Sequence, residues 1–324
     1  MELIRGIHNI KPRHRGCVLT IGNFDGVHQG HHAVLARLQE KAAQLGLPAC
    51  VMLFEPQPLE LFAGDAAPAR LSRWREKYEA LKGMQIDRML CVRFTHRFAE
   101  QAASSFIEQL LVEKLGVHYL VVGDDFRFGK GREGDFHLLE AAGRRFGFEV
   151  ISTQSFQVER QRVSSTLVRE ALAAGRMAEV ELMLGRPYAI SGRVAHGDKL
   201  GRTIGFPTAN LALKRQVIPV GGVFAVEVLC SGKTFPGVAN VGVRPTLSGT
   251  QARLEVHLFD FSGDLYGQQV KVLLRHKLRE EQKFASFTAL KEQIERDALA
   301  ARAWFGLPPF NLPSTLLEKK GTQD

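Results

Sequence analysis

The sequence contains no apolar run near the roughly 20 residues that a membrane-spanning helix needs. The basic stretch from Met1 to Arg15 is not followed by the apolar segment of a secretory signal. Cysteines are few: there are 4, with no CxxC pair, which argues against a disulfide framework or a zinc site. Three of them stand in apolar, strand-like runs, where a cysteine usually packs as a small hydrophobe. We therefore expect a cytoplasmic protein that makes no membrane contact.

Acidic residues are in deficit, with 34 Asp and Glu against 43 Lys and Arg, so the formal net charge is +9. A positive balance suits nucleic acid, and it equally suits an enzyme whose ligands are polyphosphates. The sequence lacks a long block of like charges and an aromatic-basic RNA-binding signature. We expect small-molecule ligands and no nucleic acid.

The first half of the chain alternates strand-like and helical patterns. Strands are predicted over residues 18–21, 49–54, 89–94, 119–123 and 149–152, and amphipathic helices over residues 32–45, 73–81, 104–115 and 136–146. Continuous apolar strands that alternate with helices indicate a parallel sheet covered on both faces. Residues 1–186 are therefore predicted to form a doubly wound, Rossmann-like α/β domain.

The pattern changes after Gly185-Arg186-Pro187. Short alternating strands, for example over residues 223–229, 237–243, 253–259 and 270–275, are separated by glycine-rich turns, and a helix is predicted over residues 284–305. A small antiparallel barrel or sandwich fits this pattern, and we take the β-barrel with a C-terminal helix as the prediction. Residues 187–312 are predicted to form this second domain, and residues 313–324 a flexible tail.

A glycine-rich loop with two histidines follows the first predicted strand of the α/β domain. The carboxyl end of a parallel strand is where open sheets bind ligands, and the following helix N-terminus offers free N–H groups to a phosphate. His28 and His31 can donate hydrogen bonds to a polyphosphate and stabilise charge as its α-phosphorus is attacked. The predicted phosphate-binding residues of the loop are Gly22, Asn23, Phe24, Asp25 and Gly26. A metal site made of these histidines, His32 and Asp25 is one alternative, and ordinary surface histidines are another.

A second polar motif begins at Ser164. Ser165 can cap a short helix that ends near Gly175, so that Ser164, Ser165 and Thr166 form an anion-binding nest. Arg169, one turn later, could reach the same phosphates. The alternative is a plain capped helix with a solvated arginine.

One glycine motif in the first domain is misleading. Residues 129–134 fit the GxGxxG dinucleotide fingerprint, but the preceding strand ends near Gly123 and five residues intervene. A nicotinamide site is therefore not expected there.

The second domain carries glycines four residues apart, Gly197, Gly201 and Gly205, followed by Pro207-Thr208-Ala209-Asn210. Backbone N–H groups of such a flap can wrap phosphates, while Thr208 and Asn210 offer oxygens to Mg²⁺. In the predicted strand 253–259, Leu254, Val256 and Leu258 share one face, and Glu255, His257 and Phe259 share the other. A ligand-free turn and a solvated strand face are the alternatives.

These motifs, in this order, resemble a known family. The decapeptide GNFDGVHQGH at residues 22–31, Phe54-Glu55-Pro56, GDDFRFG at residues 123–129 and SSTLVR at residues 164–169 resemble the adenylyltransferase module of bacterial bifunctional riboflavin kinase/FAD synthetases. The glycine-PTAN run and residues 222–226, 237–242 and 254–260 resemble the riboflavin kinase module. The resemblance implies that riboflavin and ATP give FMN, and that FMN and ATP give FAD and pyrophosphate, with Mg²⁺ assisting.

The resemblance also implies roles for individual residues. His28 and His31 hold phosphates, and Ser164, Ser165 and Arg169 complete the ATP site. Asp125 falls next to nucleotide or flavin, and Phe54, Phe126 and Phe128 could shape an apolar slot for the isoalloxazine, although buried core phenylalanines are an equal alternative. Glu255 is the base for the ribityl 5′-hydroxyl, while Thr208 and Asn210 handle Mg·ATP. Phe224 stands where a tyrosine is common.

Two rival functions remain open at this point. A chain of this kind could retain only one of the two activities, or it could be a flavin- or nucleotide-responsive protein that regulates RNA. The motif sets of both modules are intact, and we expect a bifunctional enzyme that is a monomer or a weak oligomer.

Overall fold

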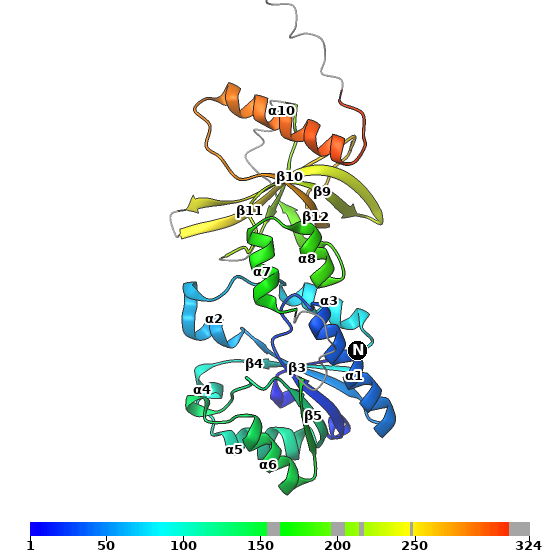
Figure 1. Cartoon of the computed structure of the whole chain (residues 1–324), viewed down its shortest axis with the longest axis vertical. Coiled ribbons are helices and arrows are strands. Elements are labelled where there is room, and N and C mark those ends of the chain that lie inside the picture. The colour runs from blue at the N-terminus through cyan, green and yellow to red at the C-terminus, as the bar shows by residue number, and fades with distance from the viewer. Residues whose placement is uncertain (154–162, 196–204, 214–216, 247–248, 311–324) are drawn as a thin grey trace, which may run out of the picture. The chain divides into compact units, whose positions relative to one another are not determined.

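The computed structural model describes residues 1–153, 163–195, 205–213, 217–246 and 249–310 (Figure 1). The chain forms two compact units. The first comprises Met1–Glu170, Leu182–Gly185 and Val217–Pro219, and the second comprises Ala171–Glu181, Arg186–Gln216 and Val220–Asp324. The chain crosses from the first unit to the second between Gly185 and Arg186, one residue before the boundary expected between residues 186 and 187. The tail predicted over residues 313–324 lies outside the described residues.

The first unit is built on a six-stranded sheet in the order β1-β4-β3-β2-β5-β6. The strands are β1 (Glu2–Arg5), β2 (Cys17–Ile21), β3 (Ala49–Glu55), β4 (Arg88–Arg93), β5 (Val117–Val122) and β6 (Glu149–Ser152). All neighbours pair in parallel. The chain adds β3 on one side of β2 and later β5 on its other side, so β2 and β5 flank the topological switch point.

Helices cover both faces of this sheet (Figure 1). They are α1 (Gln29–Leu45), α2 (Pro58–Ala63), α3 (Trp74–Gly83), α4 (His96–Ala99), α5 (Ala103–Ser105), η4 (Phe106–Lys114) and α6 (Phe136–Phe146), with short turns η1 (Ile7–Asn9), η2 (Pro12–His14), η3 (Gly64–Ala66) and η5 (Lys130–Arg132). Leu19 and Met52 pack with η4 and α6, whereas their neighbours Val18 and Val51 pack with α1 and α3. This alternation confirms the predicted doubly wound α/β fold, because successive strand residues point to opposite faces.

The strand β1 was not among the predicted strands. It pairs with β4 at the edge of the sheet. Its four residues include only two apolar ones, Leu3 and Ile4, and only Ile4 is buried. A strand this short carries too little hydrophobic pattern to be separated from a loop by sequence alone.

The second unit contains a closed antiparallel barrel in the order β10-β11-β8-β7-β12-β9. The strands are β7 (Tyr188–Ala195), β8 (Ala209–Ala212), β9 (Gly222–Cys230), β10 (Lys233–Thr246), β11 (Gly249–Leu258) and β12 (Gln269–Arg279). The helix α10 (Phe287–Trp304) begins at Ser286, whose hydroxyl accepts a hydrogen bond from the Ala289 N–H, and buries Ala298 and Ala301 against β9 and β10. The predicted β-barrel with a C-terminal helix is confirmed. The helices α7 (Ser165–Ala173) and α8 (Met177–Leu184) precede it in the chain.

The GxGxxG segment has a packing role. Added Cβ atoms would meet Ala103 at 2.8 Å from Gly129 and the Phe128 ring at 2.7 Å from Gly134. These glycines therefore let the segment after β5 fold back on itself, with Phe128 bridged to Gly134. β5 ends at Val122, so the segment does not start where a dinucleotide loop would.

Candidate active sites

The loop between β2 and α1 lies at the switch point of the parallel sheet. Its backbone is sharply folded: Phe24, Gly26 and Val27 have φ angles of 47°, 83° and 44°. A Cβ on Gly26 would lie 2.8 Å from Leu71, so this position requires glycine. The Phe24 ring is buried beneath the loop and touches the His31 ring at 5.0 Å between centroids. Phe24 therefore offers a ligand its backbone and not its side chain.

Asp25 holds the loop to two distant segments. Its carboxylate, in a residue only 2% exposed, accepts hydrogen bonds from the Leu71 and Ser72 N–H groups, each at 3.0 Å. The Arg169 Nη2 donates to the same carboxylate at 2.6 Å, and its Nε donates to the Ala69 carbonyl. Because these groups occupy the Asp25 oxygens, the alternative of Asp25 as a metal ligand loses support. Among the described residues, no group of three His, Cys, Asp or Glu side chains could hold a metal ion.

The start of α7 differs from the prediction by one residue. The Ser164 hydroxyl caps the helix by accepting from the Leu167 N–H at 3.3 Å, so the expectation that Ser165 is the cap was wrong. The Ser165 hydroxyl instead donates to the Asp25 carbonyl at 3.0 Å. Thr166 is exposed. Arg169 is paired and is not the solvated arginine of the alternative interpretation.

His28 and His31 lie together at the N-terminus of α1. Their rings stack with centroids 3.7 Å apart, and the His28 N–H donates to His31 Nδ1 at 3.2 Å. An Nδ1 that accepts a hydrogen bond carries no proton, so a neutral His31 presents its proton at Nε2. Burial, then the charges of His32 and Arg169, lowers the pKa of His28 to about 4. Burial also holds the pKa of His31 well below 6.5. The loop thus offers two neutral imidazoles at neutral pH.

The depressed pKa of His28 predicts a stability change with pH. The unfolded chain protonates this ring near pH 6.5 and the folded chain only near pH 4, so the stability present above pH 6.5 is lost as the pH falls through this window. The loss is about 3 kcal/mol for the first unit. It can be measured by Trp74 fluorescence during urea unfolding in a Trp304→Phe background, since the chain has 2 tryptophans. His28→Asn should flatten the slope, and an unchanged slope in that variant would contradict the assignment.

The predicted flavin residues belong to a chain of aromatic rings: Phe54 lies near the end of β3, and Phe126 and Phe128 follow β5. Phe126 and Phe128 stack with centroids 5.5 Å apart, and Phe54 lies 5.4 Å from Phe94. Phe54 and Phe128 are 7% and 8% exposed and belong to the core, which is the alternative interpretation. Phe126 is half-buried and Asp125 is exposed. Only these last two therefore have side-chain surface to offer a ligand.

In the second unit, Glu255 on β11 stands directly opposite Asn210 on β8 and Asn240 on β10. Residues opposite one another in antiparallel strands share a face, so the three side chains lie on one side of the barrel wall. Leu254, Val256 and Leu258 are buried on the other side, as predicted. The Glu255 side chain is 39% exposed.

The loop before β8 is held from the same face. His257 Nδ1 lies 2.9 Å from the Pro207 carbonyl, which makes Nδ1 the protonated nitrogen and fixes the turn that leads into Thr208. The Asn210 amide donates to the Thr208 carbonyl at 3.5 Å. Gly205 is exposed with a φ of 86°, while Gly197 and Gly201 lie outside the described residues.

Sequence reasoning missed two residues that the structure brings to these sites. Lys77 is fully buried beside the histidine loop, although its place on an amphipathic helix is typical of a surface lysine. Asn240 donates to Glu281 at 3.4 Å, and its Oδ1 is buried without a hydrogen-bond partner among the described residues. Asn240 falls in the motif at residues 237–242, which is the signal that could have drawn attention to it.

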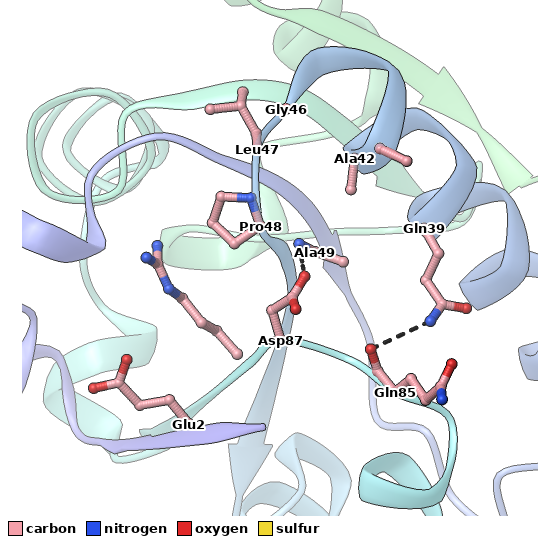
Figure 2. A pocket seen from close by; sticks show the side chains of 11 residues that line it. Glu2, Gln39, Ala42, Gly46, Leu47, Pro48, Ala49, Gln85 and Asp87 are labelled. Carbon is pink, nitrogen blue, oxygen red and sulfur yellow. Dashed lines mark hydrogen bonds between the residues drawn. The ribbon is translucent and has the colours of Figure 1, made fainter.

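A cavity of about 500 Å³ lies elsewhere in the first unit (Figure 2). It is lined by Ala49 and Arg88, the first residues of β3 and β4. It therefore lies at the amino ends of the strands, whereas the histidine loop lies at their carboxyl ends. Its polar groups are paired: Asp87 accepts from the Ala49 N–H, and Gln39 donates to the Gln85 carbonyl. This cavity supports no assignment as the nucleotide site.

Comparison with known proteins gives two family matches. Residues 10–167 match the FAD synthetase family, and residues 184–305 match the riboflavin kinase family. Bifunctional riboflavin kinase/FMN adenylyltransferases from Escherichia coli K12 and Pseudomonas fluorescens are 60% and 54% identical, over 95% and 94% of this chain and 99% and 97% of theirs.

A solved structure covers both units. The crystal structure of a macrolide-efflux protein from Streptococcus pneumoniae aligns with a TM-score of 0.78 and 31% identity, over 94% of this chain and 100% of that one. In the described parts of the present chain, no helix is both long and apolar enough to cross a membrane. The two family matches and the full-length relatives together identify this chain as a member of the bifunctional riboflavin kinase/FMN adenylyltransferase family.

Proposed function

We propose that the family's two activities are divided between the two units, with FMN adenylylation at the Gly22–His31 loop and riboflavin phosphorylation around Glu255. The protein is a transferase that makes FMN from riboflavin and FAD from FMN. The observation that carries the division is that each unit holds a separate polar cluster at a position suited to a nucleotide. One cluster lies at the switch point of a parallel sheet, and the other lies on one face of a barrel wall.

In the first unit, the FMN phosphate attacks the α-phosphorus of ATP and pyrophosphate leaves. Negative charge grows on the phosphate oxygens. Neutral imidazoles stabilise this charge by donating N–H hydrogen bonds to these oxygens. His31 Nε2–H, His28 and the free N–H groups at the start of α1 supply these donors. Ser164, Ser165, Thr166 and Arg169 complete the ATP site, with Arg169 held in place by Asp25. Asp125 and Phe126, with the rings of Phe54 and Phe128 behind them, receive the flavin.

In the second unit, Glu255 accepts the proton of the ribityl 5′-hydroxyl as this oxygen attacks the γ-phosphorus of ATP. Gly197, Gly201 and Gly205 cover the phosphates. The Thr208 hydroxyl, the Asn210 amide oxygen and the buried Asn240 Oδ1, which has no hydrogen-bond partner in the described part of the chain, are hard oxygen ligands of the kind that Mg²⁺ prefers. Mg²⁺ would be held by Thr208 and Asn210 and would neutralise charge on the phosphates. Positioning by these residues carries most of phosphoryl transfer, so a half-exposed glutamate suffices as base.

The remaining properties belong to the same proposal. Riboflavin, FMN and ATP are the partners, no nucleic acid binds, and the protein acts in the cytoplasm as a monomer or weak oligomer. The net charge of +9 favours the binding of polyphosphate ligands by electrostatic attraction.

One experiment tests the activities directly. The purified protein is incubated with riboflavin and Mg·ATP, and the flavins are resolved by chromatography. Sequential appearance of FMN and then FAD is expected. FMN alone would mean that only the kinase is active, and no new flavin would refute both activities.

The division between units predicts that a fragment from Tyr188 to Pro313 phosphorylates riboflavin by itself. It contains the whole barrel, α10 and every proposed kinase residue. Because Arg275 on β12 pairs with Glu181, which precedes this fragment, a second fragment starting at Ala171 is the matched control for stability. Kinase activity and circular dichroism are measured on both. Folded fragments that are inert towards riboflavin and Mg·ATP would contradict the division.

A further inference from the structure

Lys77 on α3 is fully buried and donates from Nζ to the Asn23 carbonyl at 2.6 Å. Burying an ammonium group is unfavourable unless it is well paired, and lysine is among the residues least often found in cores. Leu81, one turn later on α3, fills a comparable buried position with an apolar side chain. Packing alone therefore does not account for Lys77.

The hydrogen bond of Lys77 is one of several that α3 and the segment before it make with the loop. The segment before α3 also binds it: the Ser72 hydroxyl accepts from the Gly26 N–H at 2.9 Å, and the Leu71 and Ser72 N–H groups donate to Asp25. Lys77 adds a contact near the loop's start, directly before Phe24 with its φ of 47°, and the Gly22 N–H donates to the Met52 carbonyl one residue earlier. The positive φ angles of Phe24, Gly26 and Val27 turn the chain between this contact and the first residue of α1, Gln29.

The charges around Lys77 balance. It faces Asp25, Glu55, Glu60 and Arg70. Arg70 pairs with Glu55 and Glu60, and Arg169 pairs with Asp25, so three cations meet three carboxylates. Without the Lys77 ammonium this cluster would carry one net negative charge beside the loop assigned to the triphosphate. A like charge at that place opposes the binding of a polyanion.

Lys77 also acts on the imidazoles. Burial lowers the pKa of His31 most, and the charges of His28, Lys77 and His32 lower it further. Loss of the ammonium would therefore raise the pKa of His31.

We infer that Lys77 is a positioning residue of the adenylyltransferase site: it fixes the histidine loop through the Asn23 carbonyl and keeps the site's charge suited to ATP. This inference rests on the proposed function of the loop. Direct contact between Lys77 and substrate is not required.

The test uses the full chain with Lys77→Met, Lys77→Gln and the control Lys82→Met, which changes an exposed lysine of the same helix. Lys77→Met removes both charge and donor and should lower kcat and raise KM for ATP in FMN adenylylation, each by about tenfold. Lys77→Gln keeps an N–H donor without charge, so KM for ATP should rise while kcat stays closer to the starting enzyme. The acid limb of the rate profile should move to higher pH in both, and Lys82→Met should change nothing.

Unfolding followed by Trp74 fluorescence in the Trp304→Phe background reports on the fold of the first unit, and riboflavin phosphorylation by the same preparations reports on the second. Folded Lys77 variants with unchanged adenylylation kinetics and pH profile would overturn the inference. A parallel drop in kcat for both Lys77 variants that tracks their loss of stability, with KM and pH profile unmoved, would also overturn it, because that pattern marks a structural role only. If Lys77→Met does not fold, Lys77→Gln decides alone through KM and the pH profile. Failure of the unmodified chain to make FAD would instead refute the proposed function.

Discussion

Replacing Glu255 with glutamine should reduce riboflavin phosphorylation by about 10²–10⁴, the range of a general-base contribution. The amide keeps the shape of the side chain and its place opposite Asn210 and Asn240, but it cannot take the proton of the attacking hydroxyl. The KM for ATP should stay nearly constant, because Thr208 and Asn210 are untouched.

The supplied flavin makes this prediction specific. With riboflavin as the only flavin, Glu255→Gln should make neither FMN nor FAD, whereas with FMN it should make FAD at the normal rate. Glu227→Gln is the matched control, since Glu227 is a half-buried glutamate of the same barrel, paired with Arg275. Near-normal phosphorylation in Glu255→Gln would show that Glu255 is only a solvated strand residue. His257 on the same face would then be the next candidate, although its Nδ1 is engaged with the Pro207 carbonyl.

The parts of the fold that the sequence predicted well depend on local signals. The loop from Gly22 to His31 was placed correctly because a buried strand, a glycine-rich turn and a helix start follow one another within a few residues. The barrel helix was found because its apolar spacing is regular, and in the structure Ser286 caps it. Such signals can be read one segment at a time.

The contacts that organise the first site are not local. Arg169 meets Asp25 across 144 residues of sequence, and Lys77 meets Asn23 across 54. No periodicity relates these positions, so the sequence could suggest Arg169 only as a phosphate ligand and gave no reason to select Lys77. Both depend on how α3 and α7 dock on the loop, which is a property of the folded unit.

The aromatic residues illustrate a different limit. Phe54, Phe126 and Phe128 stand in adjacent motifs and are chemically alike, yet two are core residues and only Phe126 keeps exposed surface. Strand alternation places Phe54 on the face packed against η4 and α6. The position after β5 where the chain turns back decides the exposure of the other two, and turn geometry of this kind is the least predictable part of a sequence.

Replacing His31 with alanine should lower FMN adenylylation by about two orders of magnitude, the size expected for one lost transition-state donor. Riboflavin phosphorylation should hardly change. FAD formed from FMN and Mg·ATP is the readout, and His118→Ala, at an exposed histidine of β5, is the control.

The structure shows that His31 has two functions that alanine removes together. Its Nδ1 accepts the His28 N–H and so helps to cap α1, while Nε2–H is the proposed donor to phosphate. Glutamine at the same helix position can reach back to the N-cap N–H, as in a capping box, but its shorter reach in that conformation leaves the phosphate without a donor. His31→Gln should therefore recover the stability lost in His31→Ala, measured by Trp74 fluorescence, without recovering the rate. If His31→Gln restored adenylylation as well, the contribution of His31 would be capping alone. Equal loss of both activities in a folded His31→Ala protein would count against separate sites.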